Sequence, residues 1–129
     1  MSFLAKLEID GTTYNVLECK YKFKQNYSET GKPMGLPQGG DIYLRIESKG
    51  SPEFFDWMID PSHTKDGKII FYRRDAMSKL QEIKFKKAFC VYFSEHFNAI
   101  DKEPLQIEMT ISTHVFDLNG TVHEKRWKK

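Results

Sequence analysis

The feature that most constrains this sequence is an alternation of apolar and polar residues with a period of two. It is clearest in residues 105–112 and 42–47, where every second residue is apolar. Successive side chains of a β-strand point to opposite faces, so this period is typical of strands with one buried face. We therefore expect Ile42, Leu44 and Ile46 to share a buried face.

The same pattern predicts a chain made mostly of strands joined by turns. The expected strands are residues 3–9, 13–25, 42–47, 68–73, 78–93 and 105–112. Asp10-Gly11 supplies the residue types of a tight hairpin turn. Between Val16 and Leu17 the apolar phase slips by one residue, which predicts a β-bulge. Residues 76–83 also fit one face of a helix, although the alternation that follows them favours a strand.

One segment has helical periodicity. Ser51 can cap the first amide groups of a helix over residues 52–59, and Pro52 suits its first position. The apolar stripe of this helix consists of Phe54, Phe55, Trp57 and Met58. This stripe is expected to pack on the core, with Phe54, Phe55 and Met58 buried. Several antiparallel strands and one short helix predict a mainly β fold, either a barrel or a sandwich.

The alternation disappears in residues 26–41, which hold four glycines and two prolines. We expect a loop of about 14 residues here, and loops of that length are often functional. Met34 and Leu36 are apolar residues within it. Exposed apolar side chains on such a loop are suitable contacts for a neighbouring molecule.

No recognisable catalytic or metal-binding motif is present in the sequence. The four histidines, His63, His96, His114 and His123, do not form the i, i+4 pair of a helical zinc site. Residues 35–40 (GLPQGG) lack the Lys-Ser/Thr end of a phosphate-binding loop. We therefore expect no enzyme, no metal and no cofactor, with an active site assembled from distant residues as the alternative.

Charge and hydropathy limit the classes of partner. The net charge of +2 is too nearly balanced to favour nucleic acid or an anionic membrane. The longest apolar run is residues 88–93, whereas a membrane span needs roughly 20 residues. Glu8 and Asp10 interrupt the position of a secretory signal. We expect no membrane insertion, and we expect Cys19 and Cys90 to be reduced, inward-facing thiols.

A nucleic-acid-binding β-barrel remains an alternative because of one strand segment. In residues 20–24, Lys20, Lys22 and Lys24 alternate with Tyr21 and Phe23. Such a pattern can track a phosphate backbone while its aromatic rings stack on bases. In the simpler interpretation, the two rings point inward and the lysines lie in solvent. A third interpretation has the lysines facing a neighbouring subunit or a channel.

Four blocks of the sequence, taken in their order and spacing, resemble a known family. They are SFLAKLEIDGTTYNVLECKYKFKQN, EFFDWMIDPSHTKDGKIIFYRRDAMSKL, EIKFKKAFCVYFSEHFNA and LQIEMTIS. Together they resemble the Hcp proteins (haemolysin-coregulated protein) of type VI secretion systems, in particular the form found in Bacteroidetes. The resemblance covers residues 2–112. The basic residues 124–129 beyond it are expected to be a solvated end.

The resemblance implies one Hcp-like antiparallel β-barrel domain over residues 1–129, with one flanking helix. It implies a structural tube subunit whose hexameric rings stack into a tube. A contractile sheath would drive this tube out of the cell, a spike protein would tip it, and effector proteins would travel inside the rings. Assembly in the cytoplasm and export without a signal peptide are also implied. The family has no catalytic residues to carry over.

The resemblance further implies a role for the long loop. It places the loop after the second strand at the ring face, where it reaches toward the next ring. The residues expected to mediate ring stacking are Tyr27, Ser28, Glu29, Thr30, Gly31, Lys32, Pro33, Met34, Gly35, Leu36, Pro37 and Gln38.

Overall fold

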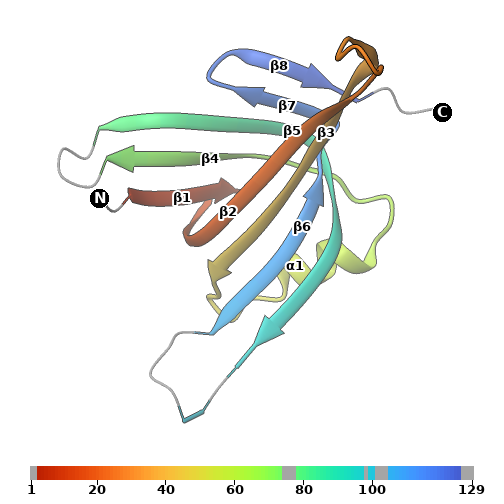
Figure 1. The fold of residues 1–129 in the computed structure, drawn as a ribbon. Coiled ribbons are helices and arrows are strands. Elements are labelled where there is room, and N and C mark those ends of the chain that lie inside the picture. Colours follow the sequence, from red (N-terminus) through yellow and green to blue (C-terminus); the bar gives the residue numbers. More distant parts are fainter. Residues whose placement is uncertain (1–2, 74–77, 98, 101–104, 126–129) are drawn as a thin grey trace.

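The computed structural model describes residues 3–73, 78–97, 99–100 and 105–125. Within these ranges the chain forms eight strands and one helix (Figure 1). They are β1 (Phe3–Ile9), β2 (Thr12–Tyr27), β3 (Pro33–Glu47), α1 (Glu53–Ile59), β4 (Lys65–Arg73), β5 (Lys79–His96), β6 (Gln106–Ser112), β7 (Val115–Leu118) and β8 (Thr121–Glu124). None of the described helical residues form a segment long and apolar enough to span a bilayer.

The strands form one antiparallel sheet in the order β4-β1-β2-β3-β6-β5-β7-β8. β4 also pairs with β5, so six strands close into the cycle β1-β2-β3-β6-β5-β4. The closure depends on β5, whose first half runs beside β4 and whose second half runs beside β6 (Figure 1). The predicted fold class, an antiparallel barrel with one short helix, is therefore confirmed, although the barrel is irregular.

The core lies inside this cycle and follows the predicted alternation. Ile42, Leu44 and Ile46 are each 0% exposed, as predicted. The predicted bulge is also present, because the register between β2 and β3 shifts between Val16 and Glu18. Burying one face of each strand provides most of the apolar area removed from water on folding.

Helix α1 differs from the prediction in its start and in its buried face. It begins at Glu53, one residue later than expected, and Pro52 rather than Ser51 occupies the N-cap position. Phe54 and Trp57 are buried, whereas Phe55 is 50% exposed. The expectation that Phe55 packs in the core was therefore wrong.

The reason for the different buried face is the position of Trp57. Its indole Nε1 donates to the carbonyl oxygens of His63 and Ala88, each at 3.1 Å. These bonds turn the helix so that positions 54, 57 and 58 point inward. Phe55 lies about 100° around the helix from Phe54, because an α-helix has 3.6 residues per turn. There its ring meets that of Phe93 at 5.7 Å between centroids.

The last two strands were not predicted. β7 and β8 form a hairpin through Asn119 and Gly120, which have φ of 51° and 98°. Asn-Gly with positive φ at both positions is a strong hairpin signal, and it is present in the sequence. The tail prediction was wrong for the residues that are described, since Glu124 belongs to β8 and Lys125 is hydrogen-bonded to the barrel. Residues 126–129 lie outside the described residues.

Candidate functional site

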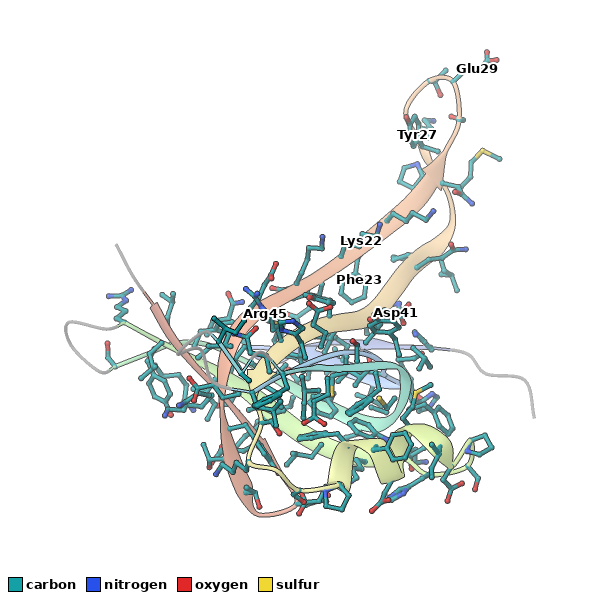
Figure 2. The ribbon with its side chains drawn as sticks, turned by 90° about the horizontal axis from the view of Figure 1, so that it is seen from below. Lys22, Phe23, Tyr27, Glu29, Asp41 and Arg45 are labelled. Atoms are coloured by element: carbon teal, nitrogen blue, oxygen red, sulfur yellow. The ribbon has the colours of Figure 1, made fainter. Side chains whose placement is uncertain are left out.

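The predicted loop is instead the outer part of the β2–β3 hairpin, which we call the arm (residues 22–38). Figure 2 shows it projecting from the body of the subunit, with Glu29 and Tyr27 at its far end and Lys22 and Phe23 near its base. Asn26 pairs with Met34, and Tyr27 pairs with Pro33. Only residues 28–32 form a turn. The prediction of a structureless loop was therefore wrong.

From Asn26 onward the arm lacks alternation because neither of its faces is buried. Its side chains lie in solvent, so no inward face requires apolar residues at every second position. Backbone pairing between the two strands is enough to form the ribbon. The turn is closed by two backbone hydrogen bonds of 2.9 Å, from Ser28 N–H to Lys32 O and from Gly31 N–H to Ser28 O.

The arm presents large apolar side chains together with charges. Tyr27 is 73% exposed, Met34 is 58% exposed and Leu36 is 60% exposed. Glu29 and Lys32 lie in the turn between Tyr27 and Met34, and Lys22 and Lys24 lie on β2 nearer the base. Apolar side chains exposed to this degree on a projecting element are typical of a surface that contacts another protein.

The base of the arm passes over the body at two glycines. A Cβ at position 39 would lie 2.4 Å from Cδ1 of Phe23 and 2.6 Å from the carbonyl oxygen of Lys22. Gly40 has φ of 97°, which L side chains rarely adopt. Position 39 therefore requires glycine because the strand passes directly beneath the Phe23 ring, and position 40 requires it because of its backbone conformation.

The hairpin of β7 and β8, which we call the C-terminal hairpin, holds the base of the arm. The Phe23 ring packs against those of Phe116 and His123, at 5.0 and 4.9 Å between centroids. His123 Nε2 lies 3.2 Å from the carbonyl oxygen of Pro37. The arm is therefore fixed to the barrel by contacts on both of its strands.

Lys125 adds polar contacts to the attachment of the arm, at Asp41, where β3 enters the barrel. Lys125 Nζ donates to Asp41 Oδ1 and to Ser112 Oγ, each at 2.7 Å. Thr113, which is buried, donates from Oγ1 to Gly40 O at 2.7 Å. This part of the site was not predicted, although the Asn119-Gly120 turn is a signal in the sequence for the hairpin that carries it.

The lysine and aromatic segment of β2 does not form an open platform for bases. The lysines at 20, 22 and 24 are exposed, as the simpler interpretation predicted. The Tyr21 ring lies 5.2 Å from that of Phe116, and Phe23 contacts the same residue. The aromatic rings are thus occupied by packing, and nothing supports the nucleic-acid alternative.

The two cysteines have the predicted state. Both are free thiols, with Cys90 buried and Cys19 partly buried against the core. Burial raises the pKa of Cys19 to about 12 and that of Cys90 to about 11. Both thiols are therefore neutral at physiological pH, which makes them poor nucleophiles. Across the described residues, no group of three His, Cys, Asp or Glu side chains is arranged to hold a metal ion.

Comparison with known proteins identifies the family. The family model described as hemolysin coregulated protein Hcp (TssD) matches residues 1–128. This chain belongs to the Hcp family. The structure of Hcp1 from Flavobacterium johnsoniae is 33% identical and has a TM-score of 0.86, with 95% of this chain and 99% of that chain covered. No match was found among the curated proteins.

More distant solved structures share the fold. Hcp1 from Salmonella typhimurium is 13% identical with a TM-score of 0.73, covering 95% of this chain and 92% of that one. A chain of the sheath-tube complex of an extracellular contractile injection system, PVC, is 18% identical with a TM-score of 0.54, covering 91% and 88%. The predicted family is confirmed, and the chain is a structural tube subunit of a type VI secretion system. Hcp is not an enzyme family.

Proposed function

We propose that six copies of this chain form a closed ring and that the arm joins each ring to the next one in the tube. The observation that supports the stacking role is the arm itself. It extends past the barrel with Tyr27, Met34 and Leu36 exposed, and its base is held by the C-terminal hairpin. A contact element that is held before it meets its partner loses less conformational entropy on binding.

Family membership and charge support the ring. A closed ring uses a heterologous interface, in which one patch of each subunit meets a different patch of the next. A net charge of only +2 keeps the electrostatic repulsion between copies small. The number six comes from the resemblance to Hcp proteins.

Membership of the Hcp family also supports a proposal about the partners of the tube and its export. We propose a tube assembled in the cytoplasm within a contractile sheath, tipped by a spike protein and exported without a signal peptide, with effector proteins inside its rings. Among the structures that share the fold are the sheath-tube complex named above and a type VI secretion system effector from Yersinia pestis. This role requires no catalysis, cofactor or metal.

The stacking role is tested by replacing both Met34 and Leu36 with Asp. The measurements are the mass of the soluble assembly by light scattering and the number of tubes in electron micrographs. We expect assemblies of six times the 15.2 kDa of one chain to persist while tubes and secretion are lost. Val122→Asp, at an exposed apolar residue of the C-terminal hairpin, is the matched control and should leave tubes intact.

Two results would contradict the proposal. Normal tubes from the Met34→Asp/Leu36→Asp double variant would show that the arm does not stack rings. Loss of the rings themselves, with an unchanged unfolding midpoint, would move the arm from the stacking contact to the contact between subunits of one ring.

A further inference from the structure

The turn of the C-terminal hairpin carries the pair of residues most prone to deamidation, asparagine followed by glycine. Asn119-Gly120 is the one such pair in the sequence, since Asn15, Asn26 and Asn98 precede other residues. In this reaction the backbone nitrogen of the following residue attacks the asparagine side chain, and glycine has no side chain to obstruct the approach. Both residues of the turn are exposed, so water reaches them. The geometry of the turn therefore decides whether they react.

The reaction needs only water as a second reactant. The N–H of Gly120 loses its proton, and its nitrogen forms a bond to Cγ of Asn119. The bond from Cγ to the side-chain nitrogen breaks, and that nitrogen leaves with the proton as ammonia. Water then opens the resulting succinimide ring at either carbonyl carbon, which leaves aspartate or isoaspartate at position 119. No group is oxidised or reduced.

Hydrogen bonds to β5 hold the group that would be attacked. Oδ1 of Asn119 accepts from the backbone N–H of Glu82 at 2.8 Å, and the N–H of Asn119 donates to the carbonyl oxygen of Glu82 at 3.0 Å. The φ of Asn119, 51°, is in the left-handed region that asparagine tolerates better than most residues. The side-chain amide is thus fixed toward β5, which runs beside the hairpin (Figure 1).

The nitrogen that would attack is held by a different residue. The N–H of Gly120 donates to Oδ1 of Asp117 at 2.7 Å. Attack requires this nitrogen to lose its proton, and a negative charge beside the carboxylate of Asp117 is electrostatically unfavourable. The closed turn therefore holds the two reacting groups apart and opposes the first step of the reaction.

The products would not fit the closed turn. A pocket beside it is lined by Lys79, Glu82, Lys84, Asp117, Asn119 and Gly120. Both lysines already form ion pairs with Glu82, so aspartate at position 119 would add a third carboxylate that neither of them balances. Isoaspartate would add a carbon atom to the main chain of a turn whose length fixes the pairing of Leu118 with Thr121.

Closure of the hairpin matters because the hairpin holds the base of the arm. Phe116 on β7 and His123 on β8 are direct partners in the register of the hairpin. Their rings pack against the Phe23 ring at 5.0 and 4.9 Å between centroids. A hairpin whose strands are out of register cannot present both rings to Phe23.

We propose that Asn119 is a deamidation site that the closed C-terminal hairpin protects. Opening of the hairpin releases the side chain from Glu82 and the Gly120 nitrogen from Asp117, and the reaction proceeds from this open form. Isoaspartate then prevents the hairpin from closing in its original register, so the base of the arm loses its contacts with the two rings. The modification does not depend on the proposed ring.

The first experiment measures the rate of conversion at position 119 in the full chain. The protein is incubated at mildly alkaline pH, folded in buffer or unfolded in guanidinium chloride, and peptide mass spectrometry follows Asn119 with Asn15 and Asn26 as internal references. We expect conversion to be about tenfold slower in the folded protein, because only the small population with an open hairpin reacts. Equal rates would overturn the protection, and no conversion in the unfolded chain would overturn the site.

A variant tests the hold on the Gly120 nitrogen. Folded Asp117→Ala should convert about threefold or more faster than the wild type, because the nitrogen loses its hydrogen bond to a carboxylate. Asp56→Ala, which removes an exposed carboxylate from α1, is the matched control and should convert at the wild-type rate. Equal rates in all three proteins would contradict the role of Asp117. The comparison of folded and unfolded wild type tests the site even if Asp117→Ala does not fold.

A second measurement tests the consequence for the arm. Converted protein that contains isoaspartate is refolded from guanidinium chloride, and its amide hydrogen exchange is compared with that of unconverted protein treated in the same way. We expect faster exchange in residues 115–124 and at the base of the arm, near Phe23 and Gly39. Equal exchange in the two proteins would overturn the link between this modification and the attachment of the arm.

Discussion

β2 and β3 each contribute to two regions of the molecule, the barrel and the arm. In the barrel half of β3, Ile42 and Leu44 are 0% exposed, whereas Met34 and Leu36 in the arm half are 58% and 60% exposed. The same pair of strands thus provides the core at one end and an exposed apolar surface at the other. Folding stability is concentrated in the barrel, and the arm is available for contacts between subunits.

The largest expected difference between the two regions is in the free energy of unfolding. Leu44→Ala removes a fully buried side chain and should lower that free energy by about 2–5 kcal/mol. Leu36→Ala changes an exposed side chain and should alter it by about 0.5 kcal/mol or less. Urea titration of dissociated subunits measures both values. Equal effects would mean that the arm packs as the barrel does.

A smaller effect is expected at the junction of the two regions. Gly39→Ala places a Cβ against the Phe23 ring and should cost about 1–3 kcal/mol of unfolding free energy. In a background of Phe23→Leu the same change should cost less, because a smaller side chain leaves room for the methyl group. A double-mutant cycle measures this coupling. Strictly additive effects would show that the aromatic ring of Phe23 does not restrict position 39.

Alkaline pH should lower the unfolding free energy of the barrel through its two thiols, Cys19 and Cys90. The folded-state pKa values of Cys19 and Cys90, about 12 and about 11, are raised above the ordinary value of 9.0. Both thiols are neutral below pH 9, so their contribution to stability is complete there. It should fall as pH rises from 9 toward the folded values, by about 1 kcal/mol per thiol at pH 10.

The measurement for this pH prediction is the difference in unfolding free energy between the wild type and a Cys19→Ala/Cys90→Ala variant from pH 7 to pH 10. Taking the difference cancels the titration of lysines and tyrosines. A difference that does not change with pH would contradict the burial of these thiols.

The smallest expected effect is the loss of the polar attachment at the base of the arm. Lys125→Met removes the hydrogen bonds to Asp41 and Ser112 and should change the unfolding free energy by less than about 1 kcal/mol. Amide hydrogen exchange near Asp41 should nevertheless become faster, because the base of the arm opens more often. Glu18→Gln, which breaks the exposed pair with Arg45, is the control and should leave this exchange unchanged. Unchanged exchange in the Lys125 variant would mean that other contacts alone hold the arm.

Helix α1 shows what a local sequence pattern can predict and what it cannot. Its existence was predictable from the spacing of apolar residues, and it lies within one residue of the predicted start. Its buried face was not predictable, because four apolar residues in a row of five fit more than one orientation. The hydrogen bonds of Trp57 to His63 and Ala88 select the orientation, and Ala88 is 31 residues away.

The sequence pattern by itself determined a mainly β antiparallel fold, with the buried face of residues 42–47 and the bulge after Val16, and the pairing of β4 with β5 decided that the sheet closes. A period of two and a phase slip are properties of neighbouring residues, so they can be recognised without knowing the fold. The tertiary structure alone decided the shape and attachment of the arm. Its strands carry no periodic signal because both faces lie in solvent. Its base is held by contacts such as His123 with Pro37 and Lys125 with Asp41, which join residues 86 and 84 positions apart. Contacts over such separations form only when the chain has closed, and no local pattern encodes them.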